Sequence, residues 1–273
     1  MLIKVLAENT SLSDKFDNEH GLSLYIETGK HKILFDTGAS DLFYRNAKKL
    51  DVDIRDVDYL IISHGHYDHG GGLERFLKAN NKAKIYIKEG AFDEFFSIKN
   101  DEEVEYIGLD RKLKDSKQIS FTRANLDIEP SIKLFTNEYH KYPRPLSNKT
   151  LLAYENNQLV EDKFEHEQNL IIEEDGKTFL ITGCAHNGLI NIIEQFYLLE
   201  GKMPDYVIGG FHLSSSGGLG ESKENIEKMS KYLLDTNSKY YTGHCTGEDG
   251  YKELKKIMAN NIEYIACGSQ III

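Results

Sequence analysis

Cysteine is scarce in this sequence of 273 residues, which contains only Cys184, Cys245 and Cys267. Three thiols are too few, and too odd in number, for the disulfide framework of a secreted scaffold, so we expect a cytoplasmic protein. Positive charge is also in short supply, because 33 basic residues face 44 acidic ones and leave a net charge of −11. A chain this acidic is not expected to bind nucleic acid or an anionic membrane surface, and its charge leaves the oligomeric state open.

Long apolar runs are missing as well. The first residues, MLIKVLAENTSLSDKF, become polar too soon for a signal peptide, and no run approaches membrane-spanning length. A Gly-x-Ser-x-Gly elbow and a Walker-type loop are both absent, so covalent serine catalysis and ATP hydrolysis lack their usual signals. No repeat, low-complexity tract or linker divides the sequence, and we therefore predict a single domain over 1–273.

Strand and helix patterns alternate along much of the sequence, which is typical of a layered α/β fold. Residues 22–28 and 32–38 predict a hairpin, and 59–63 predict a buried strand that leads into a His-rich turn. Further strands are expected at 2–7, 84–88, 169–174, 177–183, 204–211, 238–245 and 262–273, and an Asp-Gly turn at 175–176 predicts that 169–174 and 177–183 form a second hairpin. Helices are expected at 41–51, from about 73, and at 187–201, 222–235 and 248–261. Gly201 is expected to end the third of these helices, and Ser222 is a candidate N-cap of the fourth.

The segment of about 89–167 is the least regular part of the chain. It is charged and rich in aromatic residues, and its only clear strand pattern lies around Leu134. Long irregular segments in compact domains often form lids or substrate walls, and we expect that role here. Within it, Arg144 of HKYPRPLSNKT is our candidate for gripping a phosphate or carboxylate of the substrate, since a guanidinium can donate two parallel hydrogen bonds to either group. The stretch also has the composition of an ordinary solvated loop.

The chemistry of the sequence centres on His64-Gly-His66-Tyr-Asp68-His69. Three imidazoles and a carboxylate follow a strand directly and lie in a Gly-rich turn, where neighbouring side chains can converge. Imidazole nitrogen with carboxylate oxygen is the ligand set of zinc and of non-haem iron or manganese. We therefore predict that His64, His66, Asp68 and His69 are metal ligands.

Three further histidines follow predicted strands, namely His186 in LITGCAH, His212 in IGGFHL and His244 in YTGHC. A lone histidine in such a place is more often structural, but three of them beside a metal-binding turn indicate a shared site. We expect His186 and His244 to be metal ligands. His212 is a candidate ligand too, and we assign it a catalytic and substrate-contacting role.

The motifs FDTG, SHGHYDHGGGL, TGCAHNG, GGFHL and GHCTG together resemble the metallo-β-lactamase superfamily along essentially the whole chain. The TGCAH and GHCTG pair is similar to its dihydropterin-synthase-like branch, whose namesake joins a pterin to an aminobenzene ribose-phosphate. The resemblance implies an αββα sandwich, in which two mixed sheets pack face to face with helices outside.

The resemblance also implies a binuclear metal site. His64 and His66 would hold one ion, Asp68 and His69 the other, and His244 would join the second. Two divalent ions are expected, with zinc preferred and manganese or iron as alternatives.

Two positions depart from the family pattern. Cys184 stands where most members carry a bridging aspartate, and a thiolate can also ligate zinc. His166 occupies the place of the family's third histidine, but its acidic neighbours indicate a solvated loop, so we prefer His186 in that role. Whether Cys184 or His166 is a ligand stays open at this point. Asp36 of FDTG is expected to orient a ligand imidazole through its other ring nitrogen, and His20 is a candidate for a similar supporting place.

The favoured function is a metal-dependent hydrolase that uses metal-activated water on a small, anionic or phosphorylated molecule. Asp68 would orient the hydroxide and pass a proton to the leaving group. The branch resemblance offers pterin-linked synthase chemistry as an alternative. A redox or non-catalytic metal protein is a third reading, disfavoured because His66 stands where oxygen-reducing relatives have glutamate.

Overall fold

The computed structural model describes residues 1–99, 103–214 and 219–273. Its contacts divide the chain into two compact units. The first unit comprises Met1–Phe95, Ile107–Arg123 and Ile265–Ile273, and the second comprises Phe96–Tyr106 and Ala124–Tyr264. The single domain expected over 1–273 stays a prediction.

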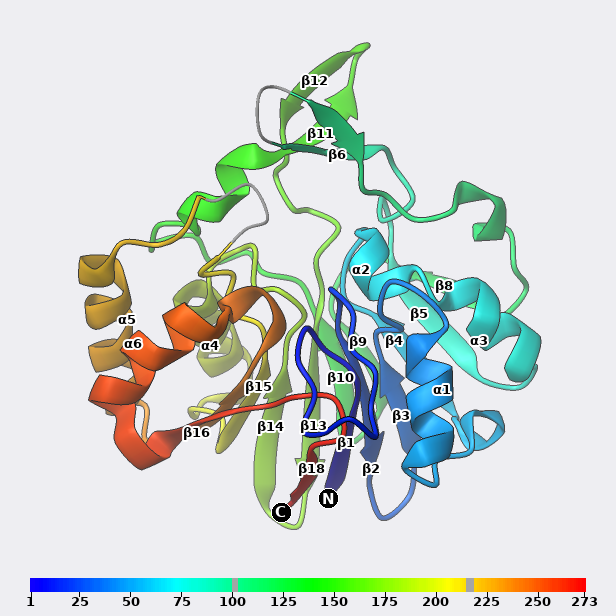
Figure 1. Ribbon diagram of the computed structural model, residues 1–273, viewed down its shortest axis with the longest axis horizontal. Coiled ribbons are helices and arrows are strands. Elements are labelled where there is room, and N and C mark those ends of the chain that lie inside the picture. Colours follow the sequence, from blue (N-terminus) through cyan, green and yellow to red (C-terminus); the bar gives the residue numbers. More distant parts are fainter. Residues whose placement is uncertain (100–102, 215–218) are drawn as a thin grey trace. The chain divides into compact units, whose positions relative to one another are not determined.

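A mixed sheet of seven strands forms the centre of the first unit, in the order β18-β1-β2-β3-β4-β5-β8 (Figure 1). Neighbours from β18 to β3 are antiparallel, whereas β3, β4, β5 and β8 run parallel. The strands are β1 (Leu2–Ala7), β2 (Ser23–Glu27), β3 (Lys32–Phe35), β4 (Tyr59–Ile62), β5 (Lys84–Lys88), β8 (Ile119–Thr122) and β18 (Gln270–Ile272). The helices are α1 (Leu42–Lys49), α2 (Tyr67–Gly70) and α3 (Leu73–Ala79).

Helices α1 and α3 cover one face of this sheet. Phe43 of α1 and Phe76 of α3 are fully buried in one apolar cluster with strand residues such as Leu60 and Ile85. Burying a large apolar side chain contributes on the order of 2 kcal/mol. This burial stabilises the strands whose ends carry the functional residues.

The second unit repeats this plan with a seven-stranded sheet in the order β17-β16-β15-β14-β13-β10-β9. Here β17, β16, β15 and β14 are parallel, and β14, β13, β10 and β9 are antiparallel. The strands are β9 (Leu126–Glu129), β10 (Ile132–Phe135), β13 (Asn169–Glu174), β14 (Lys177–Ile181), β15 (Tyr206–Gly209), β16 (Lys239–Thr242) and β17 (Ile262–Tyr264). The helices are α4 (Leu189–Glu200), α5 (Lys223–Asp235) and α6 (Glu248–Met258), and their apolar faces share one buried cluster with β14, β15 and β16.

Local signals in the sequence account for several element ends. The Asp175-Gly176 turn between β13 and β14 has φ values of 50° and 74°, which is the left-handed pair that a two-residue hairpin favours. Ser222 caps α5, because its hydroxyl accepts a hydrogen bond from the Asn225 amide at 3.1 Å. Gly201 ends α4 with a φ of 71°. These features confirm the helices predicted at 187–201 and 222–235 and the hairpin predicted at Asp175-Gly176.

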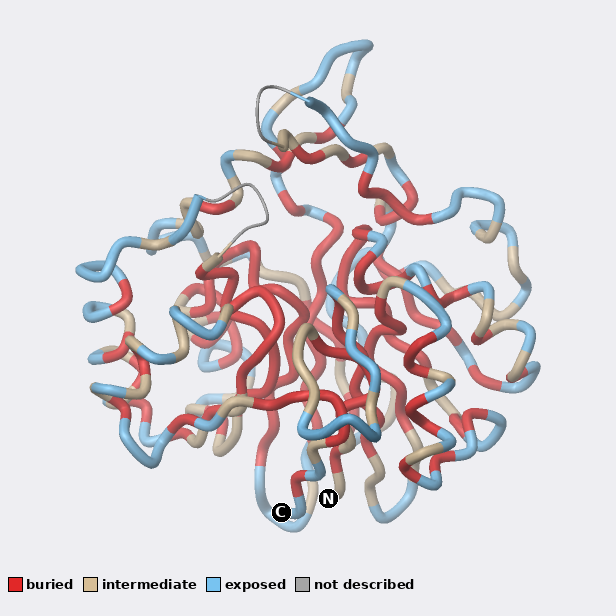
Figure 2. Tube along the Cα trace, in the orientation of Figure 1, coloured by how far each residue is buried: buried red, intermediate tan, exposed pale blue. Residues whose placement is uncertain are grey.

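The prediction that 89–167 holds a single clear strand is wrong. Besides β8, β9 and β10, the segment forms a four-stranded sheet in the order β12-β11-β6-β7. Its strands are β6 (Phe95–Ile98), β7 (Val104–Tyr106), β11 (Leu151–Glu155) and β12 (Gln158–Glu161). All three residues of β7 and most of β12 are exposed (Figure 2), so these strands lack the alternation of polar and apolar residues that marks a half-buried strand.

Across the described residues, no helix is both long enough and apolar enough to cross a membrane.

Candidate metal centre

The first cluster, defined as His64, His66, Asp68 and His69, begins directly after β4. All four residues are buried. The ring centroid of His64 lies 4.6 Å from that of His66 and 4.1 Å from that of His69, so the three imidazoles converge as predicted. Such a set of nitrogen and oxygen donors suits a divalent ion.

Glycine makes this close turn possible. A Cβ added to Gly65 would lie 2.4 Å from the Ala91 carbonyl oxygen, and one added to Gly71 would lie 2.3 Å from the Ala39 carbonyl oxygen. No side chain tolerates contacts this short with backbone atoms. The glycines of HGHYDHGGG therefore allow the imidazole-bearing turn to pack tightly on its neighbours.

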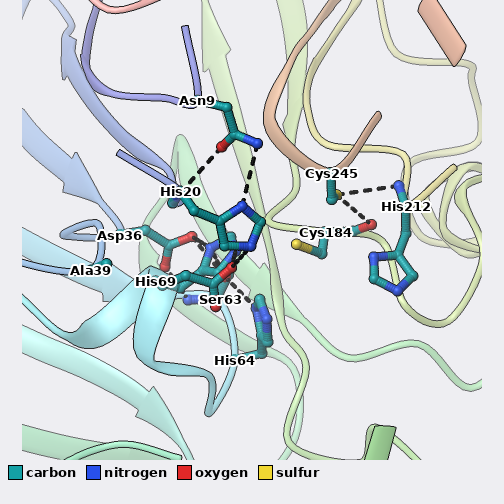
Figure 3. A network of polar contacts seen from close by, with 12 residues as sticks. Asn9, His20, Asp36, Ala39, Ser63, His64, His69, Cys184, His212 and Cys245 are labelled. Carbon is teal, nitrogen blue, oxygen red and sulfur yellow. Dashed lines mark hydrogen bonds and ion pairs between the residues drawn. The ribbon is translucent and has the colours of Figure 1, made fainter. Parts of the chain in front are cut away.

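Asp36 connects the ends of two parallel strands. It follows β3, while Ser63 follows the adjacent β4. Its Oδ1 accepts a hydrogen bond from the Ser63 amide at 2.7 Å, and its Oδ2 accepts one from the Ser63 hydroxyl at 2.7 Å. The same Oδ2 lies 2.6 Å from Nδ1 of His69 (Figure 3). Burial raises the pKa of the Asp36 carboxyl, and the charge of the neighbouring His69 opposes that rise.

This network sets the tautomers of two imidazoles. His69 donates from Nδ1 to the Asp36 carboxylate. The Ser63 hydroxyl has one proton and gives it to Asp36, so it accepts from Nδ1 of His64, 2.9 Å away. Both rings then present an unprotonated Nε2, which is the lone pair a metal ion requires. The expectation that Asp36 orients an imidazole of the cluster agrees with this geometry.

His20 approaches the same cluster from the N-terminal segment. Its Nε2 lies 3.3 Å from Oδ2 of Asp68, and its Nδ1 lies 3.3 Å from the side-chain amide nitrogen of Asn9. The Asp68 carboxylate oxygen is also 3.8 Å from Nε2 of His69. His20 thus contacts the carboxylate of Asp68, as Asp36 contacts the imidazole of His69.

The second cluster comprises Cys184, His186, His212, His244 and Cys245. Its residues follow β14, β15 and β16, which are adjacent and parallel, so their carboxyl ends meet at one edge of the sheet. All five are buried. The donor atoms of Cys184, His186 and His212 lie within 4.8 Å of one another, as do those of Cys184, His244 and Cys245. The structure thus adds a second thiol, Cys245, that the sequence interpretation did not use.

Asn148 orients His186. Its side-chain oxygen lies 2.9 Å from Nδ1 of His186, and its amide nitrogen donates to the His186 carbonyl oxygen at 2.8 Å. Nδ1 of His186 therefore carries the proton, and Nε2 is the unprotonated nitrogen of the ring. Phe164 stacks on the face of the His186 ring, with the two ring centroids 4.4 Å apart and the ring planes inclined by 4°.

Glu167 holds the loop that carries His186. Its fully buried carboxylate accepts hydrogen bonds from the backbone amides of His186 at 2.7 Å and Asn187 at 3.0 Å. The Asn187 side chain donates a third bond, at 2.8 Å. Burial raises the pKa of Glu167, and the bonds from Asn187 oppose the rise. No motif in the sequence distinguishes Glu167 or Asn148, because both act through contacts between distant segments.

The backbone of the second cluster has an uncommon conformation. Ala185, His212 and His244 have φ values of 57°, 49° and 51°, in the left-handed region that residues with a Cβ rarely adopt. The His212 amide donates to Sγ of Cys245 at 3.3 Å, and Sγ of Cys245 lies 3.6 Å from the Cys184 carbonyl oxygen (Figure 3). These contacts hold the strand ends in place despite that conformation.

Two other predicted positions have different surroundings. The expectation that His166 lies in a solvated loop is wrong, because its side chain is 4% exposed and its Nε2 lies 3.0 Å from Oδ2 of the buried Asp162. The contact with a carboxylate four residues away gives the buried imidazole a polar partner, and this allows the segment to be buried. Arg144 lies outside both clusters and lines a cavity of the second unit.

The donors therefore define a class of protein: an α/β chain whose strand ends carry histidine, aspartate and cysteine groups that can hold divalent metal ions. The sequence model of the metallo-beta-lactamase superfamily matches residues 17–154. The chain belongs to the metallo-β-lactamase superfamily.

Individual relatives agree with this assignment. An uncharacterized protein of Methanocaldococcus jannaschii, MJ0448, is 30% identical over 271 residues, or 96% of each chain. A second relative from the same organism is the 7,8-dihydropterin-6-methyl-4-(β-D-ribofuranosyl)-aminobenzene-5′-phosphate synthase. It is 30% identical over 270 residues, and the match covers 90% of this chain and 87% of the synthase. This similarity confirms the predicted branch resemblance.

Solved structures confirm the fold class. The crystal structure of Tm1679, described as a metal-dependent hydrolase of the β-lactamase superfamily, matches with a TM-score of 0.84 and 29% identity over 100% of this chain and 99% of its own. Zinc-bound PqqB of Methylobacterium extorquens matches with a TM-score of 0.63 and 11% identity, with both chains covered completely. The predicted metallo-β-lactamase-like fold is therefore confirmed.

Proposed function

We propose that this protein is a metal-dependent hydrolase whose divalent ions are held by side chains of the two clusters. One observation carries the proposal: His64, His69 and His186 each have Nδ1 in a hydrogen bond with a neighbouring side chain, which makes Nε2 the nitrogen that would bind a metal. Metal-ligating histidines are characteristically oriented in this way.

The ligands we propose are those predicted from the sequence: His64, His66, Asp68, His69, His186 and His244. Cys184 is an additional candidate, since its sulfur lies among imidazole nitrogens. A set of this kind suits two zinc ions, with manganese or iron as alternatives. A bound zinc ion would lower the pKa of a coordinated water to about 7 and so supply hydroxide at neutral pH.

The chain's own residues would do the remaining work. Asp68, whose carboxylate oxygen lies 3.3 Å from Nε2 of His20, would orient a water molecule and carry its proton to the leaving group. His212 is within reach of Cys184 and His186, and we assign it contact with the substrate at the reacting group.

The substrate we propose is a small anionic molecule, with a phosphoester or a lactone as the first classes to test. The printed description of Tm1679 as a metal-dependent hydrolase supports hydrolysis. The acidic composition disfavours nucleic acid and membrane surfaces as partners, and the few cysteines favour a cytoplasmic location.

A pterin-linked synthase is the second candidate. It is supported by the synthase of Methanocaldococcus jannaschii, which is 30% identical over 270 residues. Hydrolysis needs water as the only second reactant, whereas this synthase chemistry joins two organic molecules. Product analysis therefore distinguishes the two.

The test is elemental analysis of protein purified without added metal or chelator, followed by a hydrolysis panel of phosphoesters and lactones. We expect about two equivalents of divalent metal and turnover that a chelator abolishes. A protein that contains no metal and takes none up on titration would contradict the proposal. Metal-dependent condensation of a pterin with an aminobenzene ribose-phosphate, without hydrolysis of the panel, would favour the synthase instead.

A further inference from the structure

A cavity of about 340 Å³ lies within the second unit, between the segment 142–146, the start of α4, and α5. Its wall includes Tyr142, Arg144, Leu189, Phe211, Met229 and Tyr232. We propose that this cavity binds an aromatic ring that carries an anionic group. This ligand would be the non-reacting part of the substrate, and that assignment rests on the proposed function.

Arg144 supplies the charge for anion binding. Arg144 is half-buried and lines the cavity, and in the described part of the chain no carboxylate forms an ion pair with it. Pro143 and Pro145 flank it and restrict the backbone on both sides. A guanidinium at an apolar wall favours a carboxylate, sulfonate or phosphate, because it can donate two parallel hydrogen bonds to such a group.

Aromatic side chains supply the surface for a ring. The rings of Tyr142 and Tyr232 lie 5.7 Å apart at 60°, and Phe211 lines the same cavity. The Tyr232 hydroxyl donates to Glu194 at 2.5 Å, so this ring is fixed in place. A planar ligand can make edge and face contacts with such walls, and each contact of this kind adds about 1 kcal/mol to its apolar burial.

The carboxylate in the wall does not make the cavity a cation site. One oxygen of Glu221 accepts a bond from the Leu146 amide at 2.6 Å, and the other accepts from the Asn225 side chain at 2.8 Å. Glu221 thus serves to fasten the segment that bears Arg144. Lys228 adds a second positive charge at the rim, where it pairs with Glu224 at 2.8 Å.

The same segment connects the cavity to the second cluster. Tyr142 is anchored by a pair of hydrogen bonds between its backbone and the Asn191 side chain, at 2.8 and 2.9 Å. A few residues later, the Ser147 hydroxyl donates to the His212 carbonyl oxygen at 2.7 Å. Phe211 and Leu213, the neighbours of His212, both line the cavity. A ligand held there would lie close to His212.

Equilibrium binding tests the inference without any turnover. The probe is naphthalene-2-sulfonate, titrated calorimetrically into the purified protein, with 2-naphthol and methanesulfonate as comparators that lack the charge or the ring. We expect the sulfonate to bind at least tenfold more tightly than either comparator. Arg144→Gln should weaken it at least tenfold, and Met229→Trp, which fills the cavity, should abolish binding. Lys141→Gln is the matched control, since Lys141 is an exposed cation of the same stretch that does not line the cavity.

Three results would overturn the inference: 2-naphthol binding as tightly as the sulfonate, Arg144→Gln binding within twofold of the unaltered protein, or unchanged binding by a folded Met229→Trp. These outcomes are separate from those of the metal analysis. If the protein contains no metal and hydrolyses nothing but still binds the sulfonate, only the proposed function is contradicted. If it is an active hydrolase that does not bind the sulfonate, only this inference is contradicted.

Discussion

The carboxylate of Asp36 lies 2.6 Å from Nδ1 of His69, and both side chains are completely buried. A buried contact between an acid and an imidazole holds the ring in one orientation and one tautomer, because the acid must accept the Nδ1 proton. The position of Nε2 of His69 is therefore set by a residue from another strand end.

Asp36→Asn should remove this control while keeping the shape of the side chain. The amide oxygen can still accept from the Ser63 backbone, but the amide nitrogen then faces His69 and forces its proton onto Nε2. Asparagine also tolerates the φ of 61° at this position. We expect metal affinity to fall about 10- to 100-fold, measured by competition with a chromogenic chelator. Asp41→Asn, on the exposed start of α1, is the control, and equal affinities in the two variants would contradict this role of Asp36.

Glu167→Ala should destabilise the protein. Two buried backbone amides, those of His186 and Asn187, lose their acceptor, and an unsatisfied buried donor costs about 1–3 kcal/mol. The free energy of unfolding in urea measures the loss. Glu167→Gln keeps an acceptor oxygen and should recover part of it, and a stability equal to that of the alanine variant would show that the hydrogen bonds do not matter.

Cys184→Ser tests whether a thiolate takes part in metal binding. In protein loaded with cobalt, a sulfur ligand produces an intense ultraviolet charge-transfer band, and we expect serine at this position to remove it. The buried Cys267 belongs to the other unit and is the matched control, so Cys267→Ser should keep the band. A band that survives in Cys184→Ser but disappears in Cys245→Ser would assign the ligand to Cys245.

Cys267 should make stability depend on alkaline pH. Burial, reinforced by the charge of Glu8, raises the pKa of this thiol to about 12, whereas an unfolded cysteine has a pKa of about 8.5. Above the lower value the unfolded chain releases the proton and the folded chain keeps it. Folding is thus fully favoured below about pH 8.5 and loses up to about 1.4 kcal/mol per pH unit as the pH rises toward 12.

The measurement is the urea stability of the unaltered protein and of Cys267→Ala at pH 8 and at pH 10.5. Other groups titrate equally in both proteins, so the difference between them isolates the thiol. We expect the unaltered protein to lose more stability over this interval. Parallel losses in the two proteins would mean that the thiol does not carry the effect.

The sequence was sufficient to predict the elements with strong local signals. The hairpin at Asp175-Gly176, the helix capped by Ser222 and the imidazole turn at His64 all depend on residues a few positions apart. Such signals survive in any tertiary context, because turn chemistry and capping are decided locally.

What escaped prediction depends on distant residues. Strand β7 is exposed and only three residues long, so it owes its existence to pairing with β6 rather than to its own pattern. His166 is buried because Asp162 accompanies it. Asn148 and Glu167 orient His186 from 38 and 19 residues away in the sequence, and nothing in their neighbours reveals that role.

The left-handed backbone at Ala185, His212 and His244 has a consequence for how this protein balances stability against chemistry. Each such residue costs about 1–2 kcal/mol relative to an unstrained one, and glycine would largely escape the cost. The rest of the fold therefore compensates for strain that is concentrated where three strands deliver their donor groups. Glycine at His212 or His244 would relieve this strain but would also remove a donor group of the second cluster, so at these two positions stability and chemistry make opposite demands on the same residue.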